Sequence, residues 1–227
     1  MKDRNAFGAA NLTSKSTVKH RLVPISQAFK FAWPIFRKHF GLFTAILLTI
    51  AGAWVVLEIV VFAGQRFGIL LWVVMHLLFL SFLAGVELGF LQISLALCDG
   101  KEPRFADTFK QLALGPKFLV GQIIYLLISA LGFLLLVVPG AYLSARYALF
   151  GFCMATGEVS LMRSFQQSAD LSAGVKIHLF SILLLLLALN ALGASLLGLG
   201  LLITVPLSVL IMTTIYRQLS MADTPRA

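Results

Sequence analysis

Long apolar stretches separated by short polar segments make up most of this chain. Five of them reach the roughly 20 residues that a helix needs to cross a bilayer. They are residues 41–62, 69–97, 118–138, 177–197 and 199–219. The pattern predicts an all-α fold, a polytopic bundle of membrane helices.

A possible sixth span follows the third stretch. From Lys117 to Gly157 the chain has about 40 residues, or about 60 Å as one helix, which is twice the thickness of the hydrocarbon core. Pro139 and Gly140 occupy the second and third positions of a type II turn in the sequence Val-Pro-Gly-Ala. We therefore expect a hairpin turn at Pro139 and Gly140, after which residues 141–157 either cross the membrane or enter it and return.

The positions of lysine and arginine discriminate between these two arrangements. With six spans and a cytosolic N-terminus, all 18 Lys and Arg residues except Arg66 and Arg146 lie on the cytosolic side. This distribution follows the positive-inside rule. It predicts about six transmembrane helices in a bacterial inner membrane, with both termini cytosolic. The expected organisation is a disordered basic tail over 1–24, a membrane domain over 25–219 and a C-terminal tail over 220–227.

Composition supports a membrane protein and argues against several functions. Hydrophobic residues make up 59% of the chain and charged residues only 12%, about half the charged fraction of a soluble domain. The net charge of +9 is explained by orientation in the membrane, so we expect no nucleic-acid partner. The sequence has no catalytic motif, and Cys98 and Cys153 show no metal-binding spacing. We therefore expect no enzymatic activity, no cofactor and no metal.

Three polar segments that precede membrane stretches resemble one another. Each has a phenylalanine followed by a basic residue: Phe29 and Lys38, Phe109 and Lys117, Phe165 and Lys176. They predict amphipathic helices at the cytosolic interface that contact anionic lipid, although cytosolic linker helices would also fit. The similarity is consistent with three degenerate repeats of a helix plus a hairpin, but membrane composition alone can produce such a likeness.

Three strings carry a resemblance to known proteins. They are VPGAYLSARYALFGFCMATGE, then SFQQSADLSAGVKIHLF, and near the end GLGLLITVPLSVLIMTTIYRQL. Together they resemble a broad class of bacterial inner-membrane proteins with six membrane helices. The same unit is similar to the membrane domain fused to some glycerophosphodiester phosphodiesterases. The resemblance covers about residues 25–219 and implies a six-helix membrane unit. It implies no activity, because the fused catalytic domain is absent.

Polar side chains within the apolar stretches are the candidate functional residues, because they are energetically expensive in a membrane. His76 and Glu87 are eleven positions apart and lie on one face of a helix. Gln122, Tyr125 and Ser129 form a similar stripe on the next span. We expect the two stripes to face each other, either as a polar path for a proton, ion or small substrate, or as an interhelical hydrogen-bond cluster.

Two further features concern packing and charge. Ser81, Gly85 and Gly89 are spaced four residues apart and would let another helix approach closely. Arg146 and Glu58 lie at matching depths below the outer interface, which predicts an ion pair between them, while snorkelling of Arg146 to the interface is the alternative.

These features predict a non-enzymatic membrane protein that acts through lipid or protein contacts, as a scaffold, an accessory subunit or an envelope-homeostasis factor. A membrane-protein partner or a homo-oligomer would fit this function. The alternative is a small transporter or channel with a polar path between the second and third spans. A membrane enzyme that uses His76 and Glu87 has little support.

Overall fold

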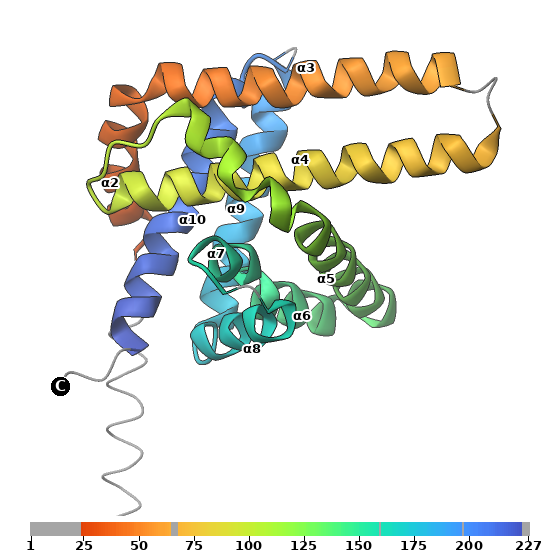
Figure 1. The fold of residues 1–227 in the computed structure, drawn as a ribbon. Coiled ribbons are helices and arrows are strands. Elements are labelled where there is room, and N and C mark those ends of the chain that lie inside the picture. Colours follow the sequence, from red (N-terminus) through yellow and green to blue (C-terminus); the bar gives the residue numbers. More distant parts are fainter. Residues whose placement is uncertain (1–23, 65–67, 159, 197, 224–227) are drawn as a thin grey trace, which may run out of the picture.

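The computed structural model describes residues 24–64, 68–158, 160–196 and 198–223. Within these residues the chain is helical and contains no strand (Figure 1). The predicted all-α membrane fold is therefore confirmed. The predicted N-terminal tail falls almost wholly outside the described residues.

Five segments of the described chain are long and apolar enough to cross a membrane. They include four single helices, α3 (Phe40–Gly64), α4 (Ile69–Cys98), α9 (Lys176–Ser195) and α10 (Leu201–Asp223). The remaining segment combines the 3-10 helix η2 (Phe105–Leu114) with α5 (Gly115–Leu135). Because α10 continues to Asp223, the predicted C-terminal tail begins inside a helix.

Four shorter helices complete the described chain. These are α2 (Ile25–Lys38), α6 (Val137–Tyr147), α7 (Phe150–Ala155) and α8 (Leu161–Leu171). Of the two arrangements considered for residues 141–157, a single crossing helix is wrong, since α6 has 11 residues and α7 has 6. The break falls at Ala148 and Leu149, where the backbone N–H of Leu149 binds the Ser168 hydroxyl at 3.1 Å.

The predicted turn at Pro139 and Gly140 is also wrong. The chain reverses at Leu136, which has extended backbone angles (φ −169°, ψ 155°) between α5 and α6. Pro139 lies in the first turn of α6, where its missing N–H costs no helical hydrogen bond. Gly140 has ordinary helical geometry and lies against α5, where an added Cβ would be 2.7 Å from the backbone nitrogen of Phe133. Close packing of the two helices, and not turn geometry, therefore explains this glycine.

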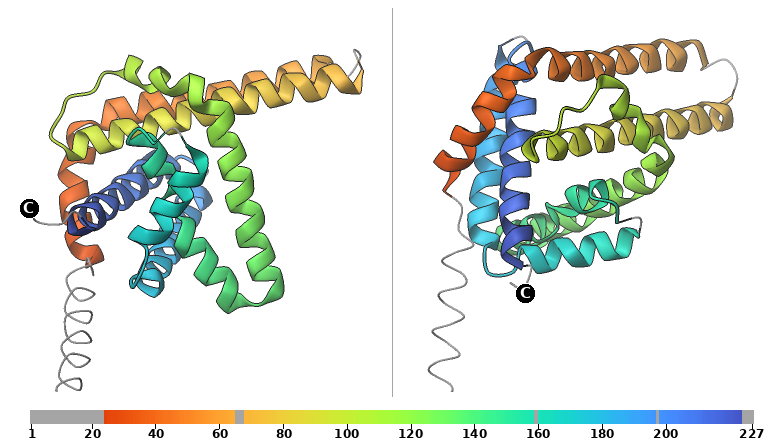
Figure 2. Two further views of the ribbon diagram at one scale, coloured as in Figure 1. Left: turned by 60° about the horizontal axis from the view of Figure 1, so that its bottom comes forward. Right: turned by 60° about the vertical axis from the view of Figure 1, so that its left-hand side comes forward.

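The long helices form two hairpins that cross each other. In Figures 1 and 2, α3 and α4 run side by side and cross α9 and α10 at a steep angle. Helix α10 is the most enclosed: 56% of its apolar window is buried, against 17 to 22% for the other four segments. It packs against α2, α4 and α9. Helix α10 is therefore the centre of the fold.

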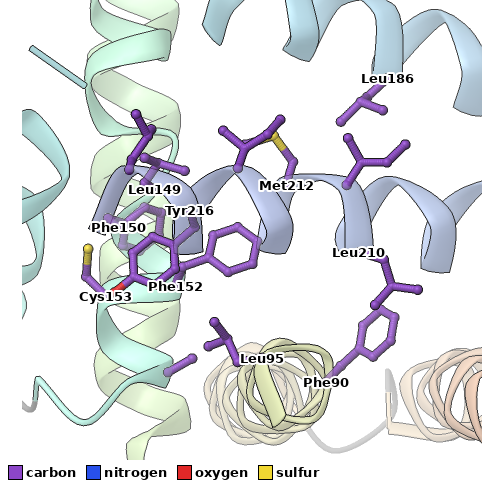
Figure 3. Close-up of a cluster of buried hydrophobic side chains, with 14 of the residues drawn as sticks. Phe90, Leu95, Leu149, Phe150, Phe152, Cys153, Leu186, Leu210, Met212 and Tyr216 are labelled. Atoms are coloured by element: carbon purple, nitrogen blue, oxygen red, sulfur yellow. The ribbon is translucent and has the colours of Figure 1, made fainter. Parts of the chain in front are cut away.

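The buried core lies where α4, α7, α9 and α10 meet (Figure 3). Phe152 of α7 stacks on Tyr216 of α10, with ring centroids 5.6 Å apart. Phe150 stacks on Phe165 of α8 at 4.9 Å. Aromatic pairs of this kind stabilise a core beyond the area that they bury, so they fix the short α7 against the long helices.

Glycines allow η2 to pack directly on α4. A Cβ on Gly85 would be 2.8 Å from the Cα of Leu112, and one on Gly89 would overlap the carbonyl oxygen of Thr108. A Cβ on Gly115, where α5 begins, would overlap the backbone carbonyl oxygen of Ser81. The predicted small-residue face thus contacts the segment that immediately follows α4 in the chain.

Ion pairs gather at one end of the molecule. Arg217 near the end of α10 pairs with Asp99 just after α4, at 2.5 Å. Lys38 at the end of α2 pairs with Glu102 at 2.9 Å. The hydrogen bond from Lys38 holds the pKa of Glu102 below its usual range. Thr156, just after α7, lies 3.1 Å from the Tyr216 hydroxyl, so the ends of α2, α4, α7 and α10 lie together.

Candidate functional site

Glu87 of α4 and Gln122 of α5 form a polar contact between the two helices. The amide nitrogen of Gln122 donates a hydrogen bond to the Glu87 carboxylate at 2.6 Å. The two predicted polar stripes therefore meet at this point. Among the described residues, Gln122 is the side chain that donates to this carboxylate.

One cavity beside this pair lies between α4, α5, α7, α9 and α10. It has a volume of about 290 Å³, and its polar lining consists of Glu87, Gln122, Tyr125 and Ser208. Phe118, Phe150 and Phe152 form an aromatic part of the wall. A mostly apolar cavity with a few convergent polar groups is typical of a small-molecule site.

A second cavity lies between α3, α4, α5 and α10. Its volume is about 330 Å³, and Glu87 and Gln122 are its polar lining residues. Trp54 of α3 forms part of its otherwise apolar wall. Glu87 and Gln122 line both cavities, so the exposed side chain of Glu87 lies in mostly apolar surroundings that are open to the surface.

The other residues of the two stripes do not extend this contact into a path. The Tyr125 hydroxyl donates to the backbone carbonyl of Ser144 in α6 at 3.3 Å. The hydroxyl of Ser129 is buried one turn further along α5. His76 packs on the ring of Trp72, with centroids 4.4 Å apart, and it lines neither cavity. Within the described part of the chain, the stripes therefore share one point of contact and do not form a continuous polar channel.

The predicted ion pair between Glu58 and Arg146 is wrong. The ion pairs of the described residues are Lys38–Glu102, Lys110–Asp107 and Arg217–Asp99. Glu58 is exposed on α3, which packs against α2, α4, η2 and α10, whereas α6 packs against α5, α8 and α9. The two residues share a predicted depth but belong to helices without a common interface.

Arg146 instead lies beside α8. Its backbone carbonyl accepts hydrogen bonds from Ser168 at 3.0 Å and Ser172 at 3.2 Å. Its guanidinium lies 5.5 Å from the centre of the Tyr147 ring. The sequence predicts a cytosolic position for the segment with α8 and an outer position for Arg146, and these contacts show that the two predictions cannot both hold.

Sequence reasoning missed one polar contact next to the first cavity. Asn190 of α9 donates to the hydroxyl of Ser208 in α10 at 3.1 Å, and its amide oxygen is buried without a hydrogen-bond partner in the described chain. Asn190 is a lone polar residue in an apolar run and forms no stripe with other polar positions on the same helical face. Its position as a polar residue inside the run LLLLLALNALG was the available signal.

The chemistry of this site suits recognition. It offers one carboxylate, an amide, a phenol and a serine hydroxyl in mostly apolar surroundings. An unpaired carboxylate is costly in such surroundings, because the loss of water is not compensated. A ligand with a positive charge or a hydrogen-bond donor would supply the compensation. Among the described residues, no group of three His, Cys, Asp or Glu side chains is arranged to hold a metal ion.

No family model, curated protein or solved structure matches this chain. The resemblance to the membrane domain fused to glycerophosphodiester phosphodiesterases therefore stays a prediction from the sequence.

Proposed function

We propose that this integral membrane protein is a non-enzymatic binding protein for an amphiphile that carries an ammonium group or another strong hydrogen-bond donor. The observation that carries the proposal is the Glu87–Gln122 pair in the walls of both cavities. Apolar walls would hold the hydrocarbon part of the ligand, and the Glu87 carboxylate would hold its polar group. Lipid contact of this kind belongs to the broader function predicted from the sequence.

The electrostatics of Glu87 support a cationic ligand. Gln122 donates to one carboxylate oxygen, Oε2, which leaves Oε1 available to a ligand. Charge-assisted hydrogen bonds are stronger than neutral ones, and the weak screening inside a membrane protein increases that difference. The cavity volumes of about 290 and 330 Å³ are at the lower end of the range for small-molecule sites.

Tryptophan fluorescence can test this proposal, because Trp54 lines the second cavity. Replacing Trp33 and Trp72 by phenylalanine leaves Trp54 as the single tryptophan of the three in the chain. Decylammonium with a terminal bromine is expected to quench Trp54 saturably in detergent micelles. Glu87→Gln is expected to weaken its binding about tenfold, since one hydrogen-bonded charge pair is lost.

Two controls make this result specific. The matching brominated decanol should bind more weakly and respond little to Glu87→Gln. Glu58→Gln removes a carboxylate that lines neither cavity and should leave binding unchanged. Equal quenching of the parent and Glu87→Gln proteins, or quenching that rises linearly without saturation, would contradict the proposal.

Transport is the second candidate function. The presence of Glu87 and Gln122 in both cavities favours it, because a ligand that moved from one cavity to the other would pass this pair. Flux of the ammonium ion into proteoliposomes, lost in Glu87→Gln, would favour transport over static binding.

For orientation, we propose that the end of the molecule with the clustered ion pairs faces the cytosol of a bacterial inner membrane. Lys38, Lys101, Arg104 and Arg217 lie at or near this end, as the positive-inside rule requires. Topology reporters fused after residues 104 and 223 should both give a cytosolic signal, and a reporter after residue 196 the opposite one. Opposite signals from residues 104 and 223 would refute this orientation.

A further inference from the structure

A second candidate site lies where α9 begins, away from Glu87. A groove of about 620 Å³ is lined by Tyr142 of α6 and by Lys176, His178 and Ser181 of α9, together with the loop that precedes α9. The ammonium of Lys176 donates to the Tyr142 hydroxyl at 2.7 Å and lies 4.1 Å from the centre of the tyrosine ring. Lys176 is thus held at the groove by a hydrogen bond and a cation–π contact.

Lys176 gives the lining of this groove a positive charge. None of the lining residues is acidic, and the three described ion pairs lie elsewhere. Arg146 is one helical turn beyond Tyr142, and its Nε atom is buried without a hydrogen-bond partner among the described residues. These cations together would attract an anion.

The start of α9 strengthens this attraction. Helix α9 has 20 residues and no side-chain cap at its N-terminus. The N–H groups of a first helical turn have no partners within the helix, and the helix dipole places partial positive charge there. Phosphate groups bind at such termini when cationic side chains are also present.

An apolar stripe leads away from the groove along α9. Ile177, Ser181, Leu184 and Ala188 are exposed and occupy one helical face, at i, i+4, i+7 and i+11. Ile177 is 86% exposed and also lines the groove. The Ser181 hydroxyl donates to its own helix, at the carbonyl of Ile177. This face is therefore effectively apolar, and it begins at the cationic groove.

We propose that this groove binds the phosphate group of an anionic membrane lipid. Lys176 and the first turn of α9 would contact the phosphate, and an acyl chain would lie along Ile177 and Leu184. The continuous apolar stripe favours a lipid over free phosphate, because inorganic phosphate would gain nothing from it. The site is distinct from the Glu87 cavities in both location and charge.

Native mass spectrometry of the full chain in a neutral detergent can test the proposal. Titration with dioleoylphosphatidylglycerol should show one tightly bound lipid per protein. Lys176→Gln is expected to weaken this binding about tenfold through the lost charge-assisted hydrogen bond, whereas Lys176→Arg should retain most of it. Ile177→Ser, at a highly exposed position, should also weaken lipid binding without affecting the fold.

Lys110→Gln is the matched control, because Lys110 is an exposed lysine that lies on η2, away from the groove, and pairs with Asp107 of the same helix. It should leave lipid binding unchanged. If Lys176→Gln and Lys110→Gln weakened lipid binding equally, the attraction would be an unspecific effect of charge, and the proposal would be overturned. Displacement of the lipid by an equal concentration of inorganic phosphate, with no effect of Ile177→Ser, would assign the groove to free phosphate and overturn its assignment to a lipid.

Discussion

Replacement of Gly89 by leucine is expected to prevent stable folding of this protein. Gly89 lies where η2 packs on α4, and a Cβ there would overlap the carbonyl oxygen of Thr108 and lie 2.7 Å from its carbonyl carbon. The obstructing atoms belong to the backbone, which cannot rotate away as a side chain can. Overpacking of this kind costs about 3 kcal/mol or more, a large part of the stability of a typical domain.

Gly89→Ala is a milder substitution whose effect on thermal stability can be measured and compared with a matched control. Gly89→Ala should lower the temperature at which the protein loses its monodisperse peak in fluorescence-detected size-exclusion chromatography. Gly52→Ala, in α3, has no atom within 4 Å of the added Cβ. It should be neutral or stabilising by up to about 1 kcal/mol, because alanine favours the helix. Equal melting of the two variants would show that η2 does not pack on α4 as described.

Hydropathy predicts the long helices well, because a membrane span requires a run of about 20 consecutive apolar residues. The predicted span over 177–197 corresponds to α9 at Lys176–Ser195, and the one over 69–97 to α4 at Ile69–Cys98. Length and apolar content decide such segments without knowledge of their neighbours.

The segment between α4 and α5 shows where this approach fails. The sequence predicts an amphipathic helix at the cytosolic interface around Phe109, whereas residues 105–114 form a 3-10 helix, η2, that packs directly on α4. Lys110 pairs with Asp107 locally, and Asp107 also accepts a hydrogen bond from the backbone of Arg104, so these two charged side chains find partners within the segment. Three glycines then allow backbone contact with α4. Hydropathy records the charges but not these local partners.

The candidate site could likewise be predicted only in part from the sequence. Periodicity predicts which side chains share a helical face, and the contact between Glu87 and Gln122 follows once α4 and α5 are neighbours. A matching depth in the membrane could not establish a contact between Glu58 and Arg146, because depth fixes a residue's position along the membrane normal but not within the membrane plane. Which helices share an interface depends on the packing around α10, and that arrangement comes from many side chains that no short motif reveals.

Substitution of Gly140 is expected to have the second large effect on stability. Its outcome distinguishes a turn at Gly140 from a contact between two helices. Gly140→Asn is expected to destabilise the protein by about 2–3 kcal/mol through overpacking, since a Cβ would meet the ring of Phe133 and lie 2.7 Å from its backbone nitrogen. A type II turn would accept asparagine at this position, because asparagine tolerates positive φ. The two interpretations therefore predict opposite results for the same variant.

Pro139→Ala completes the comparison. The first hydrogen bond of α6 runs from the backbone N–H of Gly140 to the carbonyl of Leu136 at 3.2 Å. An N–H group at position 139 would therefore have no partner within the helix, so proline costs no hydrogen bond there. Alanine should therefore change stability by less than about 1 kcal/mol. Gly132→Ala should behave like Gly140→Asn, because its Cβ would be 2.8 Å from the Cα of Gly140. Thermal stability in detergent measures all three variants. Loss in Pro139→Ala with tolerance of Gly140→Asn would restore the turn and refute the packing of α5 on α6.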